Sequence, residues 1–291
     1  MRKLSLLLLI LIFPGFLWSQ SDSGSVNFEF LPSGLHFAPL KANYQEARLG
    51  VLYYPSNGNL KVDIGNTIDL LGIGFPKIQG RLTMGVEFMA FAYSTSFKGN
   101  RLQIDAVDGF FGGNAAFSKT IGTDRILTRF RIIHNSAHFV DGHYDLSTQS
   151  WIGNKGPIPF TRDFGELILA YEKQGTAGYF RGFGGAAYAT LVRPLDIKKY
   201  SFSSGFEYAI PNLFGKVFNK NENIFLAYYV NLAGTPVYQG SNNFVFGMKF
   251  GSWLQKGILL YLNYYSGTNM FSEYYKERIN RLGFGFSVDF P

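Results

Sequence analysis

Apolar and polar side chains alternate along runs of about ten residues through most of the chain, and this period of two restricts the fold more than any other feature. In LKVDIGNTIDL, residues 60–70, leucine, valine and isoleucine fall on even-numbered positions, while Lys61, Asp63 and Asp69 fall on odd ones. The last run, residues 282–290, alternates leucine, phenylalanine and valine with glycine, serine and aspartate. Successive side chains of a β-strand point to opposite faces, so the sequence predicts an all-β fold.

The length of these runs favours a membrane barrel over a soluble sandwich. Strands of soluble sandwiches usually have about five or six residues and turn their polar face outward. Runs of about ten residues with one wholly apolar face, in a chain with 18% aromatic residues, are typical of a closed antiparallel transmembrane β-barrel, here of about 12 strands. The predicted strands are 46–55, 60–70, 80–95, 102–119, 125–137, 162–173, 177–192, 199–210, 222–233, 242–252, 257–266 and 278–290.

The residues before the first predicted strand divide into two parts. Residues 1–19 are predicted to be a signal peptide, because Arg2 and Lys3 precede a short apolar run and Ser19 is a small residue near the expected cleavage point. Residues 20–45 are rich in proline and small residues and are expected to form a periplasmic segment or a plug. The barrel is expected to cover residues 46–291, in the outer membrane of a bacterium.

Composition narrows the partners that the chain can have. The absence of cysteine excludes a disulfide framework and a lipid anchor on a cysteine thioether. The formal net charge of +7 is mild for 291 residues, and together with the export signal it favours contact with anionic lipid head groups over nucleic acid. The expected partners are therefore outer-membrane lipids or lipopolysaccharide and the machinery that assembles barrels.

One polar cluster interrupts the apolar face of a predicted strand. In RFRIIHNSAHFVDGHYD, residues 129–145, the count of two puts His134 and Ser136 on the outward face, near the long connection 138–161 that is expected to be extracellular. Parity puts Asp163 on the same face of the next strand. A serine beside an imidazole that a carboxylate orients is the arrangement of a nucleophilic hydrolase. The hypothesis is acyl transfer from a lipid ester, with Ser136 as nucleophile, His134 as base and Asp163 as the orienting group.

Two other uses of polar residues remain open. The charged residues Arg129, Arg131, Glu166 and Glu172 are predicted to point into a narrow lumen, which suits a structural barrel or a small-solute channel. Metal ligation near the long connection is a weaker hypothesis, and its candidates are His138, Asp141, His143 and Asp145. No cofactor is expected, except that a hydrolase of this kind could use calcium.

Two resemblances accompany these patterns. His134 and Ser136, two residues apart and followed by Asp163 on the next strand, resemble the outer-wall site of outer-membrane phospholipase A and lipid A deacylase barrels, although the spacing to the third residue is much longer here. More broadly, FLPSGLHFAPLKAN, the segment 129–145, FTRDFGE and SGTNMFSEYYKERINRLGFGFSVDF resemble a bacterial family of unknown function, the DUF1207 type. This second resemblance implies an exported barrel, and it indicates no mechanism because the family has no assigned activity.

The sequence therefore leaves two functions in competition. The first is an outer-membrane barrel that is structural or conducts small solutes through a charged lumen. The second is a surface lipid acyl-ester hydrolase of the phospholipase A or lipid A deacylase type.

Overall fold

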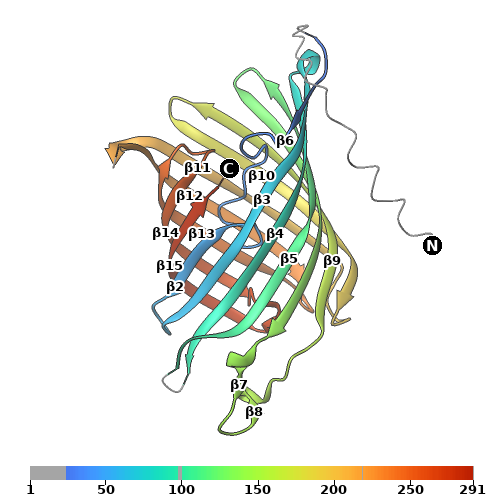
Figure 1. The fold of residues 1–291 in the computed structure, drawn as a ribbon, viewed down its shortest axis with the longest axis vertical. Helices are drawn as coiled ribbons and strands as arrows, with labels where there is room; N and C mark the ends of the chain where they lie inside the picture. The colour runs from blue at the N-terminus through green and yellow to red at the C-terminus, as the bar shows by residue number, and fades with distance from the viewer. Residues whose placement is uncertain (1–23, 98–99, 218, 291) are drawn as a thin grey trace, which may run out of the picture.

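Twelve antiparallel strands close into a single barrel in the computed structural model, which describes residues 24–97, 100–217 and 219–290 (Figure 1). The predicted fold class is thereby confirmed, whereas the predicted signal peptide lies outside the described residues. In chain order the barrel strands are β2 (Leu49–Tyr54), β3 (Asn59–Phe75), β4 (Gly80–Phe97), β5 (Asn100–Ile121), β6 (Asp124–Phe139), β9 (Phe160–Gly175), β10 (Gly178–Arg193), β11 (Tyr200–Val217), β12 (Lys220–Gly234), β13 (Tyr238–Gly251), β14 (Gly257–Thr268) and β15 (Arg278–Asp289).

The two ends of the barrel differ in the length of their connections. At one end, which we call the loop end, residues 140–159 extend away from the barrel and carry two short strands, β7 (Tyr144–Asp145) and β8 (Ser150–Trp151), with the 3-10 helices η2 (Asp141–His143) and η3 (Ile152–Asn154) (Figure 1). A third, η4 (Ser272–Tyr274), lies in the connection 269–277 at the same end. The opposite end, the turn end, carries short turns and η1 (Pro76–Ile78). Among the described residues, no helix combines the length and apolar character needed to cross a membrane.

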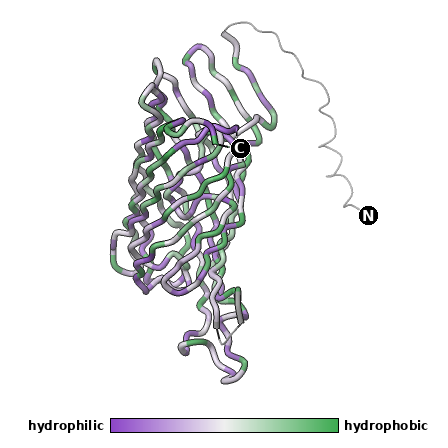
Figure 2. The backbone as a smooth tube through the Cα atoms, turned by 90° about the vertical axis from the view of Figure 1, so that its left-hand side faces the viewer, coloured by the Kyte–Doolittle hydropathy of each residue, from purple (hydrophilic) through white to green (hydrophobic). Residues whose placement is uncertain are grey.

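Hydrophobic and hydrophilic residues alternate along the strands (Figure 2). The apolar positions are exposed and many of the polar ones are buried, so the barrel has an apolar outer wall and a polar interior. Phe284 and Phe286 of β15 are about half exposed on the outer wall, whereas Lys249 of β13 and Glu207 of β11 are buried inside. The outward residues include isoleucine, leucine and phenylalanine on nearly every strand. An outer wall of this composition needs an apolar surrounding, since so many large apolar side chains would otherwise meet water.

An irregular segment, residues 33–47, runs inside the barrel, and we call it the luminal segment (Figure 1). It follows β1 (Asn27–Phe30), which pairs with residues 71–74 of β3 on the edge that β2 leaves uncovered. Leu40, Ala42, Asn43 and Glu46 are fully buried. Between the stretches paired with β2 and β1, this edge of β3 has no strand partner, although its other edge pairs with β4. The luminal segment connects β1 to β2.

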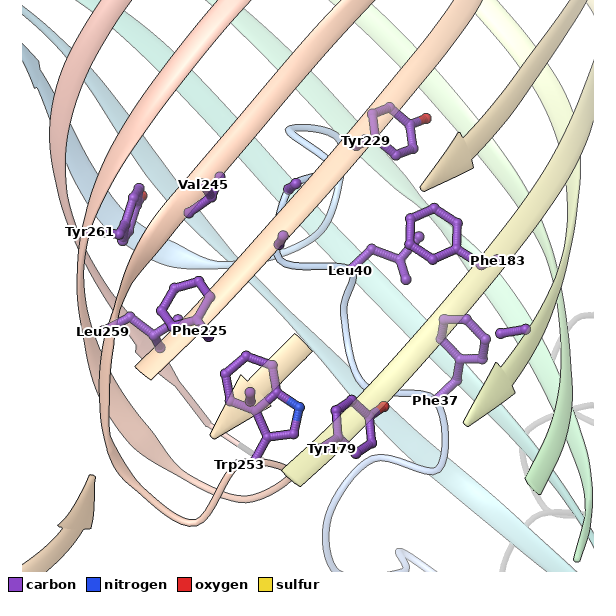
Figure 3. Packing of buried hydrophobic residues seen from close by; sticks show 14 of the residues in the cluster. Phe37, Leu40, Tyr179, Phe183, Phe225, Tyr229, Val245, Trp253, Leu259 and Tyr261 are labelled. Carbon is purple, nitrogen blue, oxygen red and sulfur yellow. The ribbon is translucent and has the colours of Figure 1, made fainter. Parts of the chain in front are cut away.

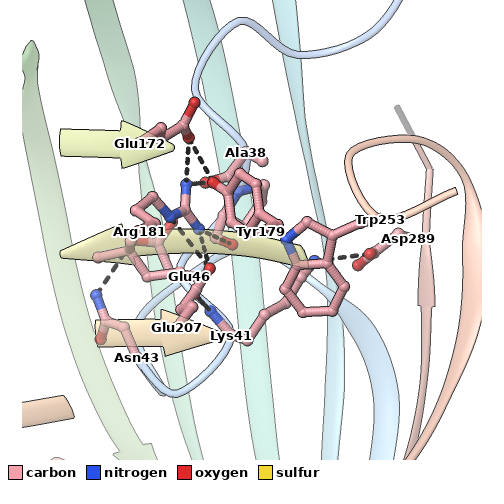
Figure 4. Close-up of polar contacts among 12 residues, drawn as sticks. Ala38, Lys41, Asn43, Glu46, Glu172, Tyr179, Arg181, Glu207, Trp253 and Asp289 are labelled. Atoms are coloured by element: carbon pink, nitrogen blue, oxygen red, sulfur yellow. Dashed lines mark hydrogen bonds and ion pairs between the residues drawn. The ribbon is translucent and has the colours of Figure 1, made fainter. Parts of the chain in front are cut away.

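Polar and charged side chains of the barrel bind the backbone of the luminal segment (Figure 4). Arg181 donates to the carbonyl oxygens of Ala38 at 2.8 Å and Pro39 at 3.2 Å, and Asn243 donates to that of Ala42 at 2.6 Å. The amide of Lys41 donates to Glu207 at 2.5 Å. The segment makes few backbone hydrogen bonds of its own, from the amide of Asn43 to Leu40 and from that of Glu46 to Asn43. The barrel side chains therefore satisfy polar groups that would otherwise be buried unpaired.

Apolar packing fills the spaces between these polar contacts. Near the turn end, Phe37 and Leu40 of the luminal segment pack among Phe183, Phe225 and Trp253 (Figure 3). A second cluster near the loop end contains Phe91, Tyr265 and Phe271, whose rings meet at centroid distances such as 5.4 Å for Phe91 and Phe271. Two cavities beside the luminal segment have volumes of about 30 and 20 Å³, close to the size of one or two water molecules. The interior is therefore a packed core around the luminal segment, and a larger cavity of about 350 Å³, lined by Tyr179, Asn223 and Trp253, lies at the turn end.

Candidate functional site on the outer wall

Three polar residues occupy the outward face of β6 at its loop end. Below them the same face carries Phe130 and Ile132, both strongly exposed and apolar. The next outward positions are His134, Ser136 and His138, of which the first two are half-buried and His138 is exposed. The outward face of β6 thus changes from apolar to polar within a single step of the alternation.

Two rows of outward residues cross the strands β5, β6, β9 and β10 at this level. The upper row, nearer the loops, consists of Gly109, Ser136, Thr161 and Arg193. The lower row consists of Phe111, His134, Asp163 and Leu191. Each residue is the direct cross-strand partner of the next one in its row. Direct partners on one face of an antiparallel pair have side chains close enough to interact, so the register sets which groups meet.

His134 and Asp163 form the polar contact at the centre of the lower row. The Nδ1 atom of His134 lies 2.6 Å from Oδ1 of Asp163, and the two side chains are 35% and 40% exposed. A carboxylate accepts but does not donate, so in the neutral imidazole the proton is on Nδ1 and donates to Asp163. This leaves the lone pair on Nε2. The Phe111 ring lies against the opposite side of the imidazole, with 4.8 Å between ring centroids.

Ser136 is on the same outward face as His134, one step nearer the loops. Two residues along a strand separate their Cα atoms by about 7 Å. No hydrogen bond joins Ser136 to His134 in the described part of the chain, so the serine is beside the imidazole without being bound to it. Gly109, its partner on β5, leaves space next to the hydroxyl: a methyl group added at Gly109 would first meet Ser136 Oγ, at 3.9 Å. The hydroxyl is therefore approachable from the outer wall.

Tyrosines mark the level of the site on the barrel. Tyr188 of β10 is the partner of Gly165, one step below Asp163, and its ring lies 4.9 Å from that of Tyr200 on β11. Both rings are exposed on the outer wall. Tyrosines on barrels concentrate at the boundary between the hydrocarbon layer and the head groups. The two rows thus lie where the apolar wall ends.

The four lumen charges lie inside the barrel in ion pairs. Arg131 makes two bonds to Glu166, at 2.7 and 3.0 Å, and Arg129 makes two to Glu46 of the luminal segment, at 2.8 and 2.5 Å. Glu172 accepts from Tyr179 at 2.6 Å and from Arg125 at 3.1 Å. These residues therefore bind one another and the luminal segment.

The metal candidates do not converge on one point. His143 binds Asp105 at 2.6 Å through Nδ1 and the carbonyl oxygen of Lys155 at 3.1 Å through Nε2, which occupies both ring nitrogens. Asp141 accepts from the amide of Gly142, Asp145 accepts from Ser147, and His138 is exposed on the outer wall. The described residues contain no group of three or more histidine, cysteine, aspartate or glutamate side chains that could hold a metal ion.

A buried polar cluster in the loops was not predicted from the sequence. Tyr274 of η4 donates to Asp105 of β5, which also binds His143, and the His143 ring stacks on Phe139 at 3.8 Å. Burial raises the pKa of Tyr274, so its hydroxyl remains a donor. The cluster ties the connection 140–159 to the connection 269–277, and its residues are too far apart in sequence for any spacing to reveal it.

No protein-family model and no curated protein sequence matches the chain, so the resemblance to the DUF1207 type is not confirmed. Solved structures with similar folds include the beta domain of the Bordetella autotransporter BrkA, with a TM-score of 0.43, 11% identity, and coverage of 84% of this chain and 99% of that one. OmpT of Vibrio cholerae has a TM-score of 0.35, 12% identity, and coverage of 92% and 98%. Similarities this weak do not bear on activity, and the fold assignment rests on the strand pairing.

Proposed function

We propose that this protein spans the outer membrane of a bacterium and hydrolyses acyl esters of lipids at its outer wall. The apolar wall supports the membrane position, and the loop end would then face outward with the two rows at the head-group level. The observation that carries the activity is the 2.6 Å contact between His134 and Asp163, with Ser136 on the same face. A histidine that is only a solvated residue of the barrel rim does not require a carboxylate to fix its tautomer, whereas a general base does.

The reaction follows from the positions of these three groups. Ser136 Oγ attacks the ester carbonyl carbon while its proton passes to Nε2 of His134, and Asp163 stabilises the imidazolium that forms. The tetrahedral intermediate collapses as the C–O bond to the alcohol breaks, and the alcohol leaves with the proton from Nε2. Water then attacks the acyl-enzyme with His134 again as base, which releases the fatty acid and restores the serine.

The decisive test uses the purified full-length protein in detergent with a phospholipid and, separately, lipid A as substrate. Wild type is expected to release fatty acid, and Ser136→Ala is expected to reduce the rate by at least about a thousandfold. Ser266→Ala is the matched control, because Ser266 also faces outward at the loop end but lies on β14. Equal release by wild type and Ser136→Ala, or no release by wild type from either lipid, would contradict the proposal.

The competing function is a small-solute channel. In the described lumen the luminal segment is bound by barrel side chains and surrounded by packed aromatic residues, so this arrangement leaves little room for a solute path. The site on the outer wall is therefore the better supported candidate.

A further inference from the structure

Arg193 extends the upper row one strand beyond Thr161, at the last residue of β10. Its side chain is exposed, and its neighbours in β10 show that it faces outward: Leu191 is 40% exposed and Val192 is buried. No carboxylate of the described residues lies within ion-pair distance of it. The outer wall thus carries an unneutralised guanidinium beside the proposed site.

The charge around Arg193 is also positive. The connection that follows β10 contains the exposed residues Lys198 and Lys199, and the Lys199 ammonium lies 5.9 Å from the centre of the Tyr188 ring. The one acid of this connection, Asp196, is bound to Lys276 at 3.2 Å and accepts from Tyr275. A basic surface therefore borders the two rows on the β10 side, at the level where head groups would lie.

The spacing of the upper row fits one molecule that contacts both ends. Neighbouring strands are about 4.8 Å apart, so the backbones at Ser136 and Arg193 are about 10 Å apart. Thr161 between them is short, and the guanidinium stands on a flexible stem that can bend over it. In a phospholipid the ester carbonyl and the phosphate are separated only by the few bonds of the glycerol backbone.

We propose that Arg193 binds the phosphate of the substrate, and that the site therefore takes acyl-ester lipids that carry a phosphate close to the ester. This inference rests on the proposed function for the identity of the reacting ester. Arginine suits the role because its planar fork of N–H groups makes paired hydrogen bonds to phosphate oxygens. Either a glycerophospholipid or the phosphorylated sugars of lipid A supplies this chemistry.

The first experiment compares turnover of lipids with and without phosphate. Arg193→Gln is expected to lower kcat/KM for phosphatidylglycerol about tenfold or more, mainly through KM, because a hydrogen bond to a charged group is lost. The kcat/KM of Arg193→Lys is expected to lie between those of wild type and Arg193→Gln. Hydrolysis of diacylglycerol, which has the same esters and no phosphate, is expected to change less than twofold. A parallel assay with lipid A decides which of the two phosphate sources the residue serves.

Arg278→Gln is the matched control for this comparison. Arg278 is also exposed at the loop end, but it lies on β15 and is bound to Gln239. Loss of this charge is expected to leave phosphatidylglycerol turnover unchanged. An equal loss in both variants would mean that net charge, not a phosphate contact, sets the rate, and it would overturn the inference.

The second experiment does not depend on turnover. Native mass spectrometry of the full-length protein measures retention of an ether-linked phosphatidylglycerol, which cannot be hydrolysed, against an ether-linked diglyceride. Arg193→Gln is expected to retain several-fold less of the phosphatidylglycerol than wild type does. Equal retention overturns the inference even if the protein is a hydrolase. If Arg193→Gln retains less phosphatidylglycerol but the wild type hydrolyses neither phospholipid nor lipid A, the proposed function is rejected and the phosphate contact stands.

Discussion

At the scale of single residues, the contact between His134 and Asp163 is the feature hardest to explain by structure alone. Both side chains are more than one-third exposed, and pairs of that kind contribute little to folding, about 0 to 1 kcal/mol. What the contact does set is the tautomer of the imidazole, which places the basic nitrogen on the side away from Asp163. A role in proton transfer therefore accounts for the geometry better than a role in stability does.

Removal of the Asp163 carboxylate is expected to lower kcat without weakening substrate binding. Asp163→Ala should reduce kcat about 10² to 10⁴-fold, since the imidazole loses its fixed tautomer and the partner of its charged form, while KM stays within about twofold. Asp163→Asn should recover part of this loss, because the amide oxygen still accepts from Nδ1. Initial-rate kinetics on phospholipid micelles measure both constants.

The control for this prediction is Asp124→Ala, at the other end of the same hairpin, where Asp124 accepts from Tyr171 at 2.5 Å. Unchanged kinetics are expected for it. If Asp163→Ala kept the wild-type kcat, the carboxylate would have no part in the reaction.

At the scale of strands, the alternation was informative because its period is the same as the structural period of a strand. All twelve predicted strands are present, and the largest differences are extensions, such as β3 to Phe75 and β11 to Val217. In β11 the pairing register with β12 shifts between Pro211 and Lys216. Proline has no backbone N–H to donate to the neighbouring strand, and the alternation of apolar and polar side chains ends here. The sequence reveals a strand only as far as one of its faces stays apolar.

Other parts of the structure left no periodic trace in the sequence. Strand β1 has four exposed residues and exists because β3 offers a free edge, which is a property of the assembled barrel. The luminal segment is irregular, so its contacts with Arg129 and Arg181 follow from three-dimensional closeness. Parity placed His134 and Asp163 on one face, but the 20 residues between β6 and β9 left their register undetermined.

Adjacent positions of one strand are expected to differ sharply in reactivity from the membrane. The chain has no cysteine, so single cysteines can be introduced cleanly. Phe246→Cys in β13, where the native side chain is 48% exposed, should react with a lipid-soluble pyrene maleimide in liposomes. Val245→Cys, where valine is 2% exposed, should react only after unfolding. Comparable labelling at both positions in the folded protein would contradict the assignment of the outer wall to lipid.

At the scale of the whole molecule, the interior has the composition of a binding site for the chain's own luminal segment. Glu46 is 1% exposed and makes two bonds to Arg129. A second arginine, Arg131, donates to the backbone carbonyl oxygen of the preceding residue, Gln45, at 3.1 Å. Breaking a buried pair by removing one partner costs about 3–5 kcal/mol, because the other charge is left unpaired.

These contacts predict that the luminal segment, and not the width of the barrel, determines conductance. Wild type in a planar bilayer is expected to show no steady current, because the segment fills the described lumen with packed side chains. Deletion of residues 24–47 should produce discrete conducting steps. Glu46→Gln, which keeps the shape of the side chain and removes its charge, should produce brief openings by weakening one anchor of the segment.

The control for these recordings is Glu29→Gln. Glu29 lies on β1 and pairs with Arg81 at the barrel's exposed surface, so this substitution should produce no current. Circular dichroism of each variant shows whether the barrel still forms, since a barrel that fails to fold also gives no current. A folded deletion variant as silent as wild type would mean that the barrel side chains close the lumen by themselves. A steady wild-type current would restore the channel as the main function, because the segment would then have to leave the lumen in the native membrane.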